Sequence, residues 1–155
     1  MIGAIRPDDV NVPLLLHVFG AMLLVGTLLT VVIAIVLGWR QANADEAQAL
    51  TRFGLRTMLL AVLPSWILMR VGAQWTESEE NLPEEIEEST WIGIGYMSAD
   101  IGVLFLLVAI VLSVIGLRRL RAGTGIGLGR AAGIIATVLL AAYLVAVWAM
   151  AAKPD

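Results

Sequence analysis

The chain has 155 residues and a formal net charge of −3, and it contains no cysteine. Hydrophobic residues make up 59% of the sequence and charged residues 15%, whereas soluble domains contain roughly 45–50% and 25%. The lack of cysteine excludes disulfides, thiolate metal sites and thiol catalysis, and no stretch has the basic and aromatic character of a nucleic-acid-binding surface. The composition predicts one integral membrane domain over residues 1–155, with its excess apolar side chains facing the lipid bilayer.

Four apolar segments are long enough to cross a bilayer, which takes about 20 helical residues. We expect transmembrane helices at about 12–38, 53–75, 90–117 and 130–152. Pro13 falls in the first turn of the first helix, where a missing N–H costs nothing. Pro64 lies inside the second helix and is expected to kink it. The short connections predict an all-α, up-down-up-down four-helix bundle.

The arginines predict the orientation, because cytoplasmic loops of membrane proteins are enriched in Arg and Lys. The first and third connections carry seven arginines, whereas the opposite side has only Arg6 and Lys153, with Arg70 inside the second helix. We therefore expect a multi-pass protein of the bacterial inner (plasma) membrane with both termini outside the cytoplasm. The arginines of the first and third connections are Arg40, Arg52, Arg56, Arg118, Arg119, Arg121 and Arg130.

The second helix has the shortest uncharged stretch, from Thr57 to Met69. This stretch is about 20 Å long, less than the hydrocarbon core of about 30 Å. Hence Arg56 or Arg70 must extend towards water or find a partner in the membrane.

A buried polar layer is the candidate site, formed by His17, Arg70, Asp100 and Tyr143. These residues lie roughly 6 to 14 Å inward from the outer boundary at a rise of 1.5 Å per residue. Ionisable groups in a membrane usually face the interior and pair. Two interpretations follow: Arg70 and Asp100 simply neutralise each other and fix the helix register, or the layer binds a ligand, ion or proton.

His17 is the only histidine, and Gly20 and Ala21 leave the helix surface beside it bare. Such a surface admits either a neighbouring helix, with His17 a plain hydrogen-bonded histidine, or a planar ligand such as haem b. A haem would need His17 of a second subunit or a methionine as its other axial ligand. The methionines considered are Met22, Met69 and Met97, and no spacing of His with Glu or Cys indicates another metal.

Small residues predict where helices approach closely. They pack helices within one chain or form a homodimer seam. The residues concerned are Gly95, Ala99, Gly102, Gly129 and Gly133.

The segment 76–90 carries seven glutamates. It is a solvated outer loop or attracts cations or a basic partner. Asn81, followed by Pro83 and Glu84, predicts a short surface helix.

The segment 14–26 (LLLHVFGAMLLVG) resembles the first helix of small bacterial predicted integral membrane proteins of unknown function, which are similar to the copper-resistance D-like group. The tail 150–154 (MAAKP) resembles their Met-x-x-Lys-Pro ending. The resemblance implies a four-helix bundle and no assigned reaction. Copper is not carried over, because the chain has no Met-rich or His-rich cluster.

No nucleophile, base and orienting group can be assembled from the sequence, so we expect no enzyme. The leading hypothesis is an accessory or binding subunit, alone as a homodimer or in a larger membrane complex, acting through the polar layer. The alternatives are a haem-b-binding electron-transfer protein and a small proton- or ion-coupled transporter. Against the transporter, no inverted repeat is visible and only Pro64 suggests a broken helix.

Overall fold

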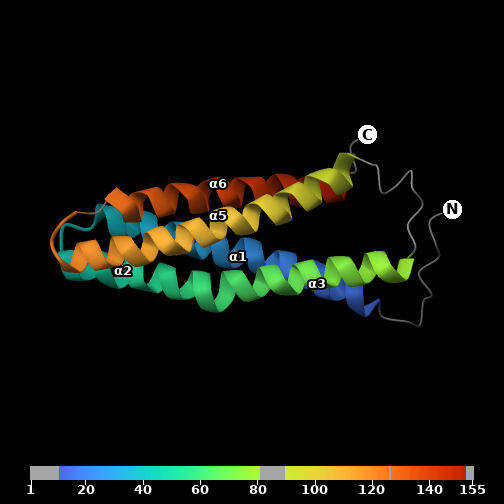
Figure 1. Ribbon diagram of the computed structural model, residues 1–155, viewed down its shortest axis with the longest axis horizontal. Coiled ribbons are helices and arrows are strands. Elements are labelled where there is room, and N and C mark those ends of the chain that lie inside the picture. The colour runs from blue at the N-terminus through green and yellow to red at the C-terminus, as the bar shows by residue number, and fades with distance from the viewer. Residues whose placement is uncertain (1–10, 81–89, 126, 153–155) are drawn as a thin grey trace.

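The computed structural model describes residues 11–80, 90–125 and 127–152. They form four long helical rods, each apolar and long enough to cross a membrane. The predicted all-α four-helix bundle is thereby confirmed (Figure 1). The rods are α1 (Val12–Arg40), a second rod made of α2 (Ala44–Thr57), η1 (Met58–Val62) and α3 (Leu63–Glu80), then α5 (Thr90–Arg121) and α6 (Gly127–Ala152). The surface helix expected near Asn81 lies outside the described residues.

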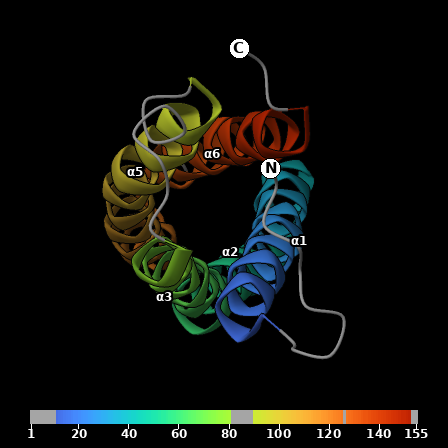
Figure 2. The same ribbon diagram turned by 90° about the vertical axis from the view of Figure 1, so that its right-hand side faces the viewer.

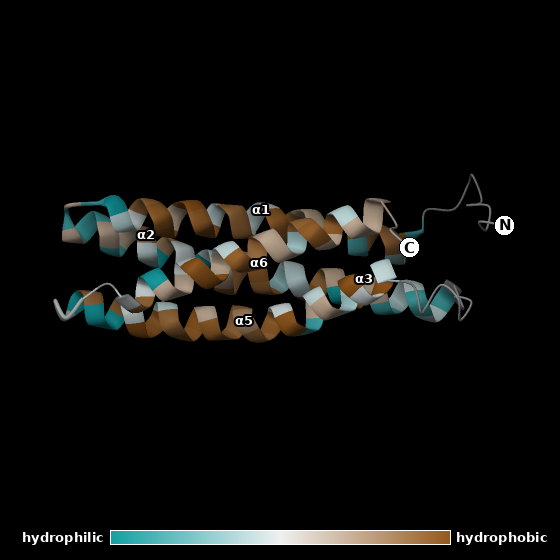
Figure 3. Cartoon of the chain, turned by 90° about the horizontal axis from the view of Figure 1, so that it is seen from above, coloured by the Kyte–Doolittle hydropathy of each residue, from teal (hydrophilic) through white to brown (hydrophobic). Residues whose placement is uncertain are grey.

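The rods form a ring in which consecutive ones are neighbours (Figure 2). α1 packs along α2 and α3, α5 packs along α6, and α6 returns to α1. We call the end where α1 begins and α6 finishes the terminal end, and the opposite end the arginine end. Hydrophobic residues cover the middle of the rods and hydrophilic residues gather towards both ends (Figure 3).

Helix ends are set by local capping. The Asn11 side chain accepts a hydrogen bond from the Leu14 N–H at 3.0 Å, and Pro13 lies in the first turn as predicted. Asn43 caps α2 by accepting from the Asp45 N–H at 2.9 Å. After α5 the chain turns at Gly123, whose φ of 68° is one that glycine adopts without strain.

The second rod begins at Ala44, so the span expected at 53–75 is part of a longer helix. The added turns have a mixed, amphipathic sequence and continue the rod along α1. Gly38 of α1 lies against Ala47 and Leu50 of α2, while Gly54 of α2 lies against Ile35. Tertiary packing against α1 therefore extends the helix beyond the apolar stretch.

Pro64 does disturb the second rod, and the disturbance takes the form of a π turn. Pro64 has no N–H, so the i−4 hydrogen bond at that position cannot form. The turn before it widens: η1 covers Met58–Val62, and the Leu63 N–H bonds to the Met58 carbonyl five residues earlier. π turns are rare and typically single insertions in α-helices.

The core is a continuous apolar column along the bundle axis. It is built from large apolar residues on α1 and η1 and from alanines mixed with large side chains on α5 and α6. Many other large apolar side chains are exposed on the outer surface, which is the pattern of helices facing lipid. Central members of the column are Leu24, Leu28, Val31, Ile35, Met58, Val62, Leu106, Ala109, Ala136 and Leu139.

Two glycines bring the backbones of α1 and α3 into contact. A Cβ added at Gly20 would collide with the backbone of Met69, and one at Gly72 would collide with the backbone of His17. Backbone on both sides leaves no flexible side chain to move away. Gly26 of α1, by contrast, has nothing within 4 Å of such a Cβ.

We predict that Gly20→Ala destabilises the fold by about 1–3 kcal/mol, the usual cost of forcing extra atoms into a packed contact. The matched change Gly26→Ala on the same helix should be neutral or slightly stabilising because it meets open space. Unfolding in mixed micelles with increasing SDS, followed by circular dichroism, measures both. Equal stability of the two variants would contradict the close α1–α3 contact.

Candidate functional site

The candidate site lies between α3 and α5 in the half of the bundle nearer the terminal end. These two helices make few close backbone contacts, and side chains bridge them. Arg70 Nη2 of α3 lies 3.2 Å from Asp100 Oδ1 of α5. The predicted need of the second helix for an arginine partner within the membrane is met by this ion pair. Arg56, at the other end of the short apolar stretch, is exposed near the arginine end.

The two members of the pair differ in exposure. The Arg70 side chain is 20% exposed, whereas the Asp100 side chain is 57% exposed. Among the described residues, Arg70 is the partner found for Asp100, and it contacts one of the two carboxylate oxygens. A carboxylate accepts up to about four hydrogen bonds, so Asp100 retains capacity to bind a donor.

Tyr96 extends the pair into a four-residue network. The Arg70 guanidinium carbon lies 4.9 Å from the centroid of the Tyr96 ring, within range of a cation–π interaction. The Tyr96 hydroxyl donates to Glu77 Oε2 at 2.5 Å. Tyr96 and Asp100 are four residues apart on α5, so both reach the same face of α3. We call Arg70, Glu77, Tyr96 and Asp100 the seam network.

Trp66 adds a further hydrogen bond across the same seam, because its Nε1–H donates to the Ala99 carbonyl at 3.0 Å. The sequence patterns did not indicate Trp66, Glu77 or Tyr96 as site residues. The spacing could have found two of them: Trp66 precedes Arg70 by one turn, and Tyr96 precedes Asp100 by one turn. Residues four apart share a helix face, so the partners of an in-membrane ion pair belong at those positions.

His17 lies at the neighbouring α1–α3 contact. Its Nδ1 is 3.0 Å from the Met69 carbonyl oxygen. Because a carbonyl only accepts, Nδ1 carries the proton in this contact, and Nε2 of a neutral ring is then an acceptor. The helix surface beside Gly20, which the sequence suggested was bare, is covered by the α3 backbone at Met69.

Tyr143 is in a different seam from the other three predicted residues. It is 4% exposed and packs on Gly102 between α6 and α5. Its hydroxyl has no hydrogen-bond partner among the described residues. The structure thus pairs Arg70 with Asp100. His17 bonds to Met69, the residue directly before Arg70, and no hydrogen bond connects Tyr143 to the other three residues.

The small residues singled out in the sequence make contacts within one chain. Gly102 receives the Tyr143 ring, Gly95 the end of the Met150 side chain, and Gly133 the Trp39 ring. Ala99 is buried and supplies the carbonyl that Trp66 binds. Gly129 lies against Gly116, where the α5 and α6 backbones approach.

Comparison with protein-family models, with curated proteins and with solved structures finds no match to this chain. Within the described ranges, no group of three or more His, Cys, Asp or Glu side chains comes together as a metal site. The site offers an ion pair and a hydrogen-bond network able to hold a donor.

We predict that Arg70→Leu and Asp100→Leu each destabilise the bundle more than the double variant does. Each single change leaves one charge unpaired in an apolar setting, while the double change removes both. We expect a coupling of about 1 kcal/mol, the scale of polar contacts between membrane helices. A double-mutant cycle of SDS-induced unfolding measures it. Arg56→Leu, at an exposed arginine of the same rod, should leave stability almost unchanged, and additive single effects would argue against the pair.

Proposed function

We propose that this chain is a non-enzymatic accessory or binding subunit of the bacterial plasma membrane. In the proposed orientation the terminal end lies outside the cytoplasm and the arginine end inside. The seam network is the binding site, and its ligand is a hydrogen-bond donor or cation on another membrane protein or on a second copy of this chain.

The supporting observation is the exposed carboxylate of Asp100. Arg118 marks the start of the basic end of α5, and a hydrocarbon core of about 30 Å corresponds to about 20 residues before it. Asp100 then lies about two residues, or about 3 Å, inside the outer edge of the apolar region. A charged side chain is costly there, so it is rare unless it has a partner or a role.

The surroundings of Asp100 fit a helix-docking face. Met97, Ile101 and Leu104 flank it on α5 and are all exposed. A transmembrane partner would cover these apolar side chains and place a donor against the free oxygen of Asp100. Polar contacts of this kind between membrane helices contribute about 0.6–2 kcal/mol each, enough to select one partner face over others.

We predict that a photo-crosslinking amino acid at Leu104 captures a membrane protein when the chain is irradiated in its native membrane. Leu104 lies one turn from Asp100 and is 62% exposed; Met22 on α1, across the ring from α5, is 70% exposed and is the matched control. The adduct, identified by mass spectrometry, should appear at Leu104, be absent at Met22 and fall strongly in Asp100→Asn. The same adducts at both positions, or an adduct unaffected by Asp100→Asn, would reject this binding face.

A haem-b-binding electron-transfer protein is the second candidate, and the tautomer of His17 is the observation in its favour. Histidines that bind metals usually donate their other ring N–H to a carbonyl or carboxylate. His17 has this arrangement, with Nδ1–H directed to the Met69 carbonyl and Nε2 left as an acceptor.

For this second candidate we predict a Soret band in the gently solubilised protein that shifts on reduction with dithionite and disappears in His17→Ala. Tyr143→Phe, which also alters a buried polar side chain, should retain the band. A spectrum without the band would reject haem b and leave the docking proposal as the remaining explanation of the site.

A further inference from the structure

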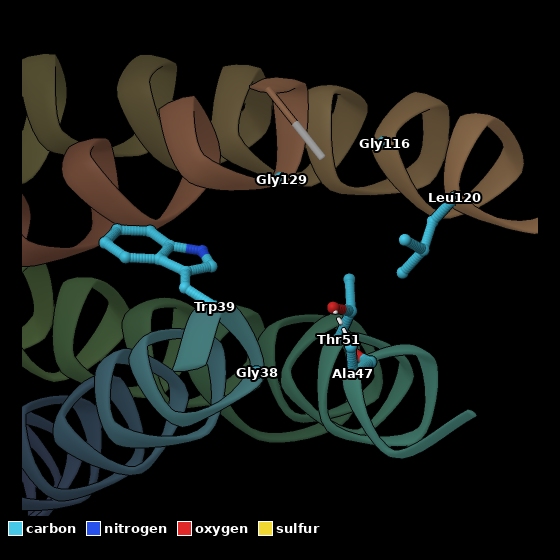
Figure 4. Close-up of a pocket in the computed structure, with 7 residues that line it drawn as sticks. All are labelled: Gly38, Trp39, Ala47, Thr51, Gly116, Leu120 and Gly129. Atoms are coloured by element: carbon cyan, nitrogen blue, oxygen red, sulfur yellow. Dashed lines mark hydrogen bonds between the residues drawn. The ribbon is translucent and has the colours of Figure 1, made fainter. Parts of the chain in front are cut away.

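A small cavity lies at the arginine end, far from the seam network. It is enclosed by the last turn of α1, by α2, by the end of α5 and by the start of α6 (Figure 4). Its walls are mainly backbone and small side chains, including Gly38, Gly116 and Gly129. The enclosed space is about 20 Å³, which holds one water-sized group.

The indole N–H of Trp39 is a buried donor without an acceptor among the described residues. The nitrogen edge of the ring faces the cavity (Figure 4). The benzene ring of the indole lies against Gly133 through Cζ2 and Cη2, so the indole cannot turn away without losing that packing. A buried donor left unpaired is strongly disfavoured, and the cavity is where an acceptor fits.

None of the described residues around the cavity accepts a hydrogen bond from Trp39 Nε1–H. The Thr51 hydroxyl, on the cavity wall, donates to the Ala47 carbonyl at 2.8 Å. Ser113, one turn before Gly116 on α5, is 1% exposed and its hydroxyl also lacks a partner among the described residues. Two buried polar groups at this end of the bundle are therefore unsatisfied by the chain.

The charge around the cavity identifies the class of acceptor. The seven arginines of this end are all exposed, and none of them forms an ion pair within the described ranges. Only Asp45 and Glu46 oppose them there, seven positive charges against two negative. Arg40 directly follows Trp39, and Arg130 directly follows Gly129. Basic residues at a membrane surface attract anionic lipid headgroups, and arginine binds phosphate through paired N–H groups.

We propose that this cavity is a phosphate site for an anionic phospholipid headgroup. One phosphate oxygen enters the cavity and accepts the hydrogen bond from Trp39 Nε1–H. The rest of the phosphate is too large for the enclosed space and stays at the mouth, where Arg40 and Arg130 balance its charge. The site is independent of the docking face at Asp100, and it fixes the depth of the arginine end against the headgroup layer.

The test titrates phosphatidylglycerol into the detergent-solubilised full chain and measures bound lipid by native mass spectrometry. Trp39→Phe keeps an aromatic ring and removes the donor, and we expect it to weaken binding about tenfold, the usual effect of losing a hydrogen bond to a charged group. Trp148→Phe, at an exposed tryptophan near the terminal end, is the matched control and should bind as the parent does. Arg40→Gln with Arg130→Gln should weaken binding while leaving Trp39 intact, and circular dichroism checks that each variant is folded.

Two further arms identify the source of the phosphate. Diacylglycerol, which has the same chains without phosphate, should bind weakly and with no dependence on Trp39; equal binding would overturn the phosphate assignment. Inorganic phosphate that displaces the lipid only in chains with Trp39 supports the same site and shows that free phosphate also enters it. If Trp39→Phe binds phosphatidylglycerol as tightly as Trp148→Phe does, the cavity holds water and the proposal fails.

Discussion

The arrangement of the four helical rods depends on the backbone contact between α1 and α3. Apolar side chains gain nothing by leaving lipid for another helix, so membrane helices associate through close packing and polar contacts. Gly20 and Gly72 provide the close packing, since each lies directly against the backbone of the other helix. The contact fixes the position of α3 along α1, and with it the height of Arg70 in the bundle. The His17 bond to the Met69 carbonyl lies in the same contact.

The α3–α5 seam follows from that placement by a different physical route. Here the helices are joined by long side chains, with the Arg70–Asp100 pair, the Tyr96–Glu77 hydrogen bond and the Trp66 indole spanning the distance. Such contacts are directional and require matched partners, whereas glycine contacts require only small size. A seam of this kind is where a ligand can compete for a donor or an acceptor, because the Asp100 carboxylate is only partly satisfied by its own chain.

The sequence predicted the number of helices and the Arg70–Asp100 pair for related reasons. In a chain of this composition, long apolar runs indicate membrane-spanning helices. Two opposite charges inside such runs are costly unless they pair. It failed where packing decides. The rod beginning at Ala44 depends on contact with α1, and the side of Tyr143 that faces Gly102 depends on how α5 and α6 rotate. The start at Ala44 does not follow from an apolar run, because these turns are polar on one side. The facing of Tyr143 does not follow from hydropathy, because several rotations of an almost uniformly apolar helix bury similar surface.

The apolar surroundings of the helices also explain why polar atoms without a hydrogen-bond partner are significant. In a soluble core, water can reach many buried hydroxyl and indole groups, but within the hydrocarbon core of a bilayer the protein itself must supply the partner. Trp39 lies at the arginine end, where headgroups offer many acceptors and arginines attract anionic ones. Tyr143 lies deeper, between α5 and α6, where no headgroup reaches. Both residues thus have a buried polar group without a hydrogen-bond partner among the described residues. Their depths point to different explanations: a lipid contact for Trp39 and close packing on Gly102 for Tyr143.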